Sequence, residues 1–168
     1  MQSGERIGRG LYYDQMPVGF EFTTMGRTIT ETDLVNFINL TWFTEEVFVN
    51  THDRATHALP DRVVPGGMIY AFAEGLVAPS MQFTGLAFLG MTLDIKKPTV
   101  VGDTIHVDVR VVESRAASSG NRGVVRTTNT VVNQRGETVL VYEPLRLVSG
   151  SPKPGGPCEA APVNPARR

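Results

Sequence analysis

Apolar residues recur at helical spacing in the middle of the chain, around a pair of glycines. The stretch 62–80 places them at Met68, Ile69, Phe72, Leu76 and Val77, with the small residues Ala71, Ala73 and Gly75 between them. This pattern predicts a turn at Pro65, Gly66 and Gly67 followed by a buried helix. Because the first N–H groups of a helix lack acceptors, Gly66 and Gly67 are candidates to hold a carbonyl oxygen or an anion. A purely structural tight turn is the alternative.

The second half of the chain changes to a period of two, which is typical of half-buried strands. In the stretch 105–111, IHVDVRV, apolar and polar residues alternate strictly. We predict further strands at 86–95, 124–133 and 138–148, with turns at Gly102-Asp103 and 134–137 and a loop at 114–123. Together these segments predict an antiparallel sheet.

Two shorter elements precede the central helix. The stretch 20–24, FEFTT, alternates as in a short strand. Thr30 with Asp33 three residues later resembles a capping box, so a helix is expected to begin there and to end between 40 and 43. The order of all these elements predicts an α+β fold in which one antiparallel sheet wraps around a central helix.

The stretch 42–61 has no regular period and is rich in groups that could perform chemistry. It holds Glu45 and Glu46 and two of the three histidines, His52 and His57. Since neighbouring residues point in different directions, at most one of the two glutamates is expected to face a given site. Exposed or capping positions are the alternative for both histidines.

Length and composition narrow the possibilities. The 168 residues suit one domain, placed at 11–149 between a loose arm at 1–10 and a Pro- and Gly-rich tail at 150–168. Lys and Arg number 16 against 17 Asp and Glu, for a formal net charge of -1, which argues against a nucleic-acid partner. A single cysteine, Cys158, excludes an internal disulfide framework and a cysteine metal cluster. Without a membrane-spanning or signal-like apolar run, we expect a cytoplasmic protein with no membrane partner.

Three stretches resemble the MaoC-like dehydratases of the hot-dog fold, a group that includes the (R)-specific enoyl-CoA hydratases. They are RTITETDLVNF at 27–37, RVVPGGMIYAFAEGL at 62–76 and LDIKKPTVVGDTIHVDVRV at 93–111. Together with the last two strands, the resemblance covers about 11–148. It implies a hot-dog fold, in which the antiparallel sheet wraps around the central helix.

The resemblance also implies a ligand class. Such proteins bind acyl thioesters of coenzyme A or of acyl carrier protein, use no other cofactor and no metal, and form homodimers or larger homo-oligomers. A backbone N–H at the helix start, here of Gly66 or Gly67, polarises the thioester carbonyl. Thr41, Trp42 and Met68 are expected to contribute to substrate binding.

One departure from the family leaves the reaction open. Active hydratases carry an Asp and, five residues later, a His after the first helix, but these positions correspond to Thr41 and Glu46. In one hypothesis the protein hydrates or dehydrates its substrate with Glu46 or Glu45 as base, assisted by His52 or His57. In a second it is a thioesterase that uses Glu74 on the central helix. In a third it binds an acyl thioester without turning it over, as a partner of an active subunit.

Overall fold

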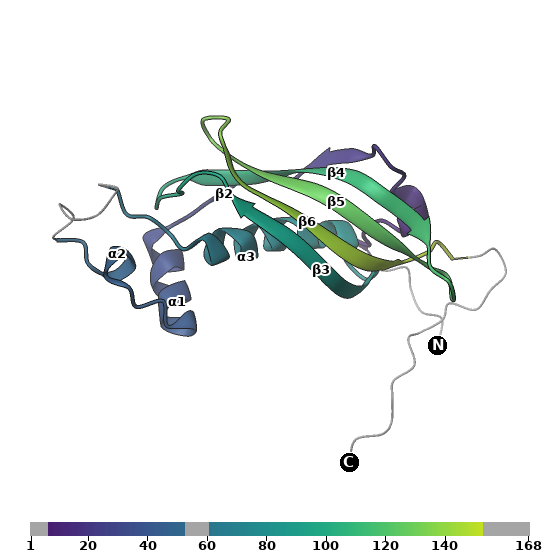
Figure 1. The fold of residues 1–168 in the computed structure, drawn as a ribbon, viewed down its shortest axis with the longest axis horizontal. Helices are drawn as coiled ribbons and strands as arrows, with labels where there is room; N and C mark the ends of the chain where they lie inside the picture. The colour runs from purple at the N-terminus through teal and green to yellow at the C-terminus, as the bar shows by residue number, and fades with distance from the viewer. Residues whose placement is uncertain (1–6, 53–60, 153–168) are drawn as a thin grey trace, which may run out of the picture.

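The structure, a computed structural model, describes residues 7–52 and 61–152 and shows a long antiparallel sheet curved around one helix (Figure 1). In chain order its elements are η1 (Tyr13–Gln15), β1 (Glu21–Thr23), β2 (Arg27–Thr28), α1 (Glu31–Thr41), α2 (Glu46–Val49), α3 (Gly66–Val77), η2 (Ala78–Met81), β3 (Gly85–Ile95), β4 (Thr104–Ala116), β5 (Arg122–Asn133) and β6 (Thr138–Ser149).

The sheet has the strand order β1-β4-β5-β6-β3, with the short β2 also paired to β4, and all of these pairings are antiparallel. Two of its turns are those predicted from the sequence. Gly102 and Gly136 lie there with φ of 95° and 75°, a left-handed backbone that glycine adopts without steric cost. The predicted α+β hot-dog fold is therefore confirmed.

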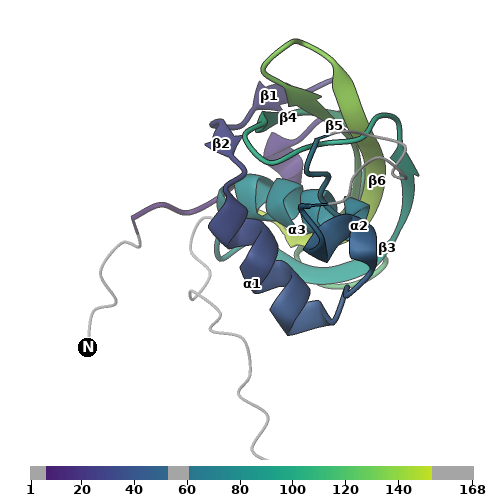
Figure 2. The same cartoon turned by 90° about the vertical axis from the view of Figure 1, so that its left-hand side faces the viewer.

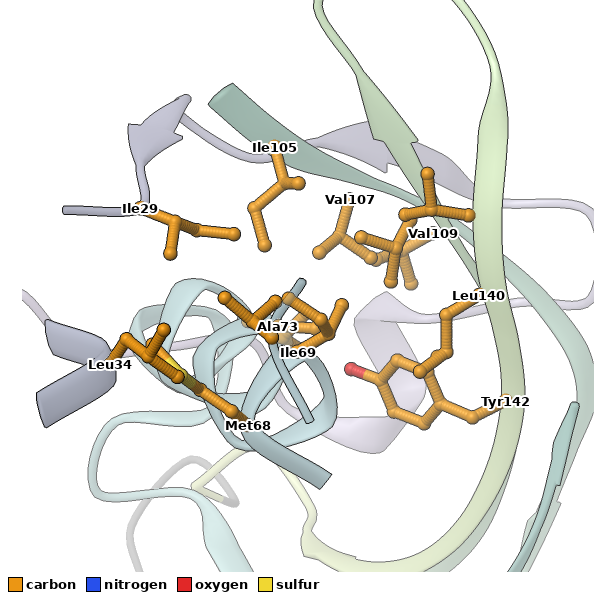
Figure 3. Close-up of a cluster of buried hydrophobic side chains, with 14 of the residues drawn as sticks. Ile29, Leu34, Met68, Ile69, Ala73, Ile105, Val107, Val109, Leu140 and Tyr142 are labelled. Atoms are coloured by element: carbon orange, nitrogen blue, oxygen red, sulfur yellow. The ribbon is translucent and has the colours of Figure 1, made fainter. Parts of the chain in front are cut away.

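Helix α3 lies against the concave face of the sheet and forms the centre of the core (Figure 3). Its buried side chains pack against those of β4 and β6, and burying one large apolar side chain stabilises the fold by ~1.5–3 kcal/mol. This packing fixes the position of the first turn of α3. The buried side chains of this core include Met68, Ile69, Ala73 and Val77 from α3, Ile105, Val107 and Val109 from β4, and Leu140 and Tyr142 from β6.

Helix α1 begins as the sequence predicts. The Asp33 N–H donates to Thr30 Oγ1 at 3.2 Å, and the Thr30 N–H donates to Asp33 Oδ2 at 2.9 Å. These reciprocal bonds satisfy two N–H groups at the helix start. The helix ends at Thr41, and the next residue, Trp42, caps it: its N–H donates to the Ile38 carbonyl at 2.8 Å, and its left-handed backbone (φ 61°) turns the chain away from the helix.

Three local predictions need correction. The stretch 42–61 is not irregular throughout, because Glu46–Val49 forms the short helix α2, which is too short to show a helical period. Gly66 and Gly67 belong to the first turn of α3 and do not form a separate turn before it. The predicted loop 114–123 is shorter, since β4 continues to Ala116 and β5 begins at Arg122.

Both ends of the described chain are hydrogen-bonded to the body of the domain. The Gly10 N–H donates to the Gln82 carbonyl at 2.9 Å, and the Gly150 N–H donates to the Asn121 carbonyl at 2.8 Å. Gly150 is buried, so packed structure extends at least to the first residue of the predicted tail. Residues 1–6 of the predicted arm and 153–168 of the predicted tail, including Cys158, lie outside the described residues.

Candidate functional site

The first turn of α3 carries two backbone N–H groups without an acceptor. Pro65 is the N-cap residue, and its carbonyl accepts the N–H groups of Met68 at 2.9 Å and Ile69 at 3.3 Å. Within 7–52 and 61–152, Gly66 and Gly67 have no acceptor for theirs. Because the helix dipole adds partial positive charge at this end, the turn is suited to an oxygen that carries negative charge.

The two glycines differ in their surroundings. A Cβ added at Gly66 would overlap with Ile95 Cδ1 of β3, so a side chain there would require the Ile95 side chain to move. At Gly67 an added Cβ would have no described atom within 4 Å, and the residue is exposed. A cavity of about 40 Å³ beside Gly66, lined in part by Val64 and Leu140, has room for about one water molecule. Gly67 is therefore the more accessible of the two.

Helices α1 and α2 meet in a corner at the end of the molecule where α3 begins (Figures 1 and 2). Three rings hold the corner together, with centroids 6.0 Å apart for Phe37 and Phe43 and 6.2 Å apart for Phe43 and Phe48. Arg62, in the segment that enters α3, donates its Nε–H to both carboxylate oxygens of Glu31 at 2.9 Å. This ion pair ties the start of α1 to the approach to α3.

The predicted loop carboxylates lie at the start of α2. Glu45 is the N-cap residue and Glu46 the first helical residue, and both are exposed. Glu46 Oε1 accepts a hydrogen bond from Asn50 Nδ2 at 2.8 Å, which restrains its carboxylate. His52 is also exposed, and its backbone N–H donates to Asn50 Oδ1 at 2.8 Å. His57 lies outside the described residues.

The predicted substrate-binding residues beside the glycines have different environments. Thr41 ends α1 and donates its hydroxyl to the Phe37 carbonyl at 2.6 Å. The Trp42 residue is 83% exposed, which is unusual for so large an apolar side chain. Met68 is fully buried in the core beneath the first turn of α3 (Figure 3). The exposed corner thus contains Trp42, while Met68 supports the turn from within.

Glu74, the carboxylate predicted on the central helix, forms an ion pair with a buried arginine of β6. Arg146 Nη2 donates to Glu74 Oε1 at 2.5 Å and to Oε2 at 2.7 Å. The Arg146 side chain is 8% exposed and that of Glu74 is 25% exposed. Both oxygens of Glu74 are therefore engaged by one guanidinium group.

The ion pair belongs to a group of polar side chains between α3 and the sheet, which we call the polar strip: Glu74, Thr127, Asn129, Tyr142 and Arg146. Within the described chain, both side-chain polar atoms of Asn129 and the hydroxyls of Thr127 and Tyr142 are buried without a hydrogen-bond partner. Leaving one such group unsatisfied costs about 1–3 kcal/mol. Burial, and then the charge of Glu74, raise the pKa of Tyr142. The phenol is therefore neutral, and it lies close to Glu74 and Asn129.

Sequence reasoning overlooked the strip residues from β5 and β6. The signal was present in the period of two, which places Thr127 and Asn129 on the inward face of one strand and Tyr142 and Arg146 on that of the next. An arginine at an inward position predicts a buried ionic partner, because an unpaired buried charge is very costly. Glu74 of the neighbouring helix is that partner.

The described residues carry neither a metal-binding cluster nor a membrane-spanning helix. Among 7–52 and 61–152, no group of three or more His, Cys, Asp or Glu side chains could hold a metal ion. Helices within the same ranges are too short or too polar to cross a membrane.

Comparisons with known proteins agree with this architecture. The family model described as the FAS1-like dehydratase domain region matches residues 16–141. The chain is similar to the (R)-specific enoyl-CoA hydratase of Rhodospirillum rubrum, with 24% identity over 100 residues that cover 60% of this chain and 69% of the relative.

Two solved structures are also similar to this chain over most of its length. R-hydratase PhaJ1 from Pseudomonas aeruginosa has a TM-score of 0.71 at 26% identity, and the match covers 84% of this chain and 88% of that one. A Mycobacterium tuberculosis protein with a double hot-dog fold has a TM-score of 0.75 at 22% identity, covering 90% of this chain and 48% of that one. The second likeness shows the fold alone.

Proposed function

Since the chain belongs to the FAS1-like dehydratase domain family, as its resemblance to MaoC-like dehydratases predicted, we propose that it is a hydro-lyase acting on an acyl thioester. It adds water to a 2-enoyl thioester, or removes water from the 3-hydroxyacyl thioester. The acyl group is carried by coenzyme A or by a carrier protein, and the chemistry needs no further cofactor. The observation that carries this proposal is the N–H of the exposed Gly67 at the start of α3, which has no acceptor among the described residues.

The Gly67 N–H is the proposed thioester-carbonyl site. When water adds to C3 of the enoyl group, negative charge develops on the thioester oxygen. A fixed N–H with a helix dipole behind it stabilises that charge without reorganisation. Proton transfer to C2 then completes the addition.

Glu46 is the proposed base that takes the proton from the attacking water. It stands where the family has its histidine, and the α1–α2 corner lies at the end of the molecule where α3 begins (Figure 2). The hydrogen bond from Asn50 Nδ2 at 2.8 Å gives the carboxylate a defined orientation. Glu45 is the alternative, since it lies one residue earlier and has no capping bond of its own among the described residues.

Strand β3 supports a proposed homodimer. It lies at the edge of the sheet, and its large apolar residues are 40–59% exposed: Leu86, Phe88, Leu89, Met91 and Ile95. An unpaired edge with apolar side chains is a template for pairing with another strand. The proposed partner is the same edge of a second copy, which would extend the sheet across both subunits.

Two spectroscopic assays on the purified protein test the reaction. Loss of the enoyl absorbance of crotonyl-CoA is the result expected for a hydratase. Release of free thiol from saturated acyl-CoAs would instead favour hydrolysis with Glu74. Acyl-CoA binding without either reaction would favour the non-catalytic hypothesis.

The variant Glu46→Gln tests the assignment of the base. Glutamine keeps the size of the side chain and can still accept from Asn50, but it cannot take up a proton. We expect kcat to fall by about 10²–10⁴, the usual contribution of a general base. Glu45→Gln is the matched control and should retain activity. The reverse pattern would identify Glu45 as the base, and full activity in both variants would show that neither glutamate is.

A further inference from the structure

The polar strip contains more hydrogen-bonding capacity than the described protein uses. Asn129 and Tyr142 lie directly opposite each other on β5 and β6, and Figure 3 shows the Tyr142 hydroxyl directed toward α3. Among the described residues, neither polar atom of the Asn129 amide and neither of the Tyr142 and Thr127 hydroxyls has a partner at normal hydrogen-bond geometry, although the Tyr142 hydroxyl interacts with Asn129 and Glu74. Buried polar groups in folded proteins almost always have partners, so this concentration indicates a polar group that the strip receives from outside.

The electrostatics of the strip favour a neutral group. Arg146 and Glu74 neutralise each other through bonds of 2.5 and 2.7 Å, so neither attracts a further charged ligand strongly. The remaining atoms comprise both donors and acceptors. A hydroxyl, which donates and accepts at once, matches this set.

The strip lies within reach of an acyl chain whose thioester carbonyl is bound at Gly67. Glu74 is seven residues further along α3, which corresponds to a rise of about 10 Å. The outer end of the strip borders β3, where Glu74 is 25% exposed and the centroid of the Phe88 ring, which belongs to the proposed subunit interface, lies 5.7 Å from the guanidinium carbon of Arg146.

We propose that the polar strip recognises a hydroxyl group at the far end of the acyl chain. The substrate is then a thioester of an oxygen-bearing acyl group, and Asn129 and Tyr142 determine this specificity. The inference rests on the proposed acyl-thioester function, and it assigns to Glu74 and Arg146 a positioning role at the border of the strip.

Calorimetric titration of the full chain tests the proposal with saturated acyl-CoAs, which cannot be hydrated. Each chain length is offered with and without a terminal hydroxyl. The native protein should bind the hydroxylated ligand of the matching length about tenfold more tightly or better. Asn129→Leu and Tyr142→Phe should each bring the two dissociation constants close together. Thr130→Val, on the outward face of β5, should keep the preference.

The outcomes separate this inference from the proposed reaction. Equal dissociation constants at every length, or a preference that survives both strip variants, would overturn it even if crotonyl-CoA is hydrated. A hydroxyl preference that disappears in the variants would support it even if no hydration occurs, in which case only the proposed reaction fails. Thermal melting confirms that each variant is folded, and Tyr142→Phe, which only removes an unpaired hydroxyl, guards against loss of the fold in Asn129→Leu.

Discussion

At the scale of single residues, the start of α3 shows how two neighbouring glycines serve different purposes. Gly66 packs against β3, since a side chain there would have to displace that of Ile95. At Gly67 the described structure leaves space for a side chain. The sequence shows only a glycine pair, so this difference could not be predicted from it. In the proposed mechanism, Gly67 contributes its N–H group.

Substitution of Gly67 tests that distinction. Gly67→Pro removes the N–H at a place in the first helical turn where proline is tolerated, and we expect kcat/KM to fall by about 10²–10³. Gly67→Ala keeps the N–H and should retain most of the activity. It should also stabilise the protein by about 0.5–1 kcal/mol through its helix propensity. Steady-state kinetics and thermal melts measure both effects. Equal losses in the two variants would mean that space, not the N–H, is what the site needs.

At the scale of elements, the turn between β5 and β6 is stabilised by charge. Glu137 accepts hydrogen bonds from Asn133 Nδ2 at 2.9 Å, from Lys97 Nζ at 2.7 Å and from Arg135 Nε at 2.9 Å. Its pKa is lowered from the usual 4.5 to about 2, first by the bond from Asn133 and then by those from Lys97 and Arg135. The turn therefore depends on the ionised carboxylate.

This pKa predicts a specific loss of stability in acid. A depressed folded-state pKa contributes stability that is complete above pH 4.5 and is lost as the pH falls toward 2. Glu137→Gln should lower the melting temperature at pH 7 and make it less sensitive to pH between about 5 and 2. Glu21→Gln, which removes a looser pair with Arg110 at 3.4 Å, is the control. Parallel melting curves for the native protein and Glu137→Gln across this range would contradict the prediction.

The elements could be predicted wherever one physical signal dominated. Thr30 and Asp33 specified the start of α1, and the alternation in 105–111 specified β4, because capping and half-burial leave local patterns. Helix α2 was missed because four residues are too few for a period. The polar strip was missed because Asn129 and Tyr142 meet only when β5 pairs with β6 in the register that the whole sheet sets.

At the scale of the molecule, the sheet covers one side of α3 and ends in the short strand β1 at one edge and the long strand β3 at the other (Figure 1). Strands β4, β5 and β6 pair on both sides, whereas β3 pairs only with β6. All of β3 except Gly90 and Leu93 is exposed, although it contains several large apolar residues. Such a strand in a single subunit is an aggregation hazard unless it is covered. A second copy of the chain covers it with a matching edge.

Leu89→Lys tests the proposed dimer. Leu89 lies within β3 and is 52% exposed, so a lysine there can be solvated in one subunit but would place like charges near each other across a symmetric interface. We expect the dimer dissociation constant, measured by sedimentation equilibrium, to rise about tenfold or more, which corresponds to ~1.4 kcal/mol. Val112→Lys makes the same change at a residue of β4 that is 40% exposed and should leave the association unchanged.

Because the Gly67 turn and Ile95 of β3 are adjacent through Gly66, a dissociated Leu89→Lys subunit should also lose activity on dilution while the native protein keeps it. A native protein that sediments as a monomer, or equal association of the two lysine variants, would exclude β3 as the subunit interface.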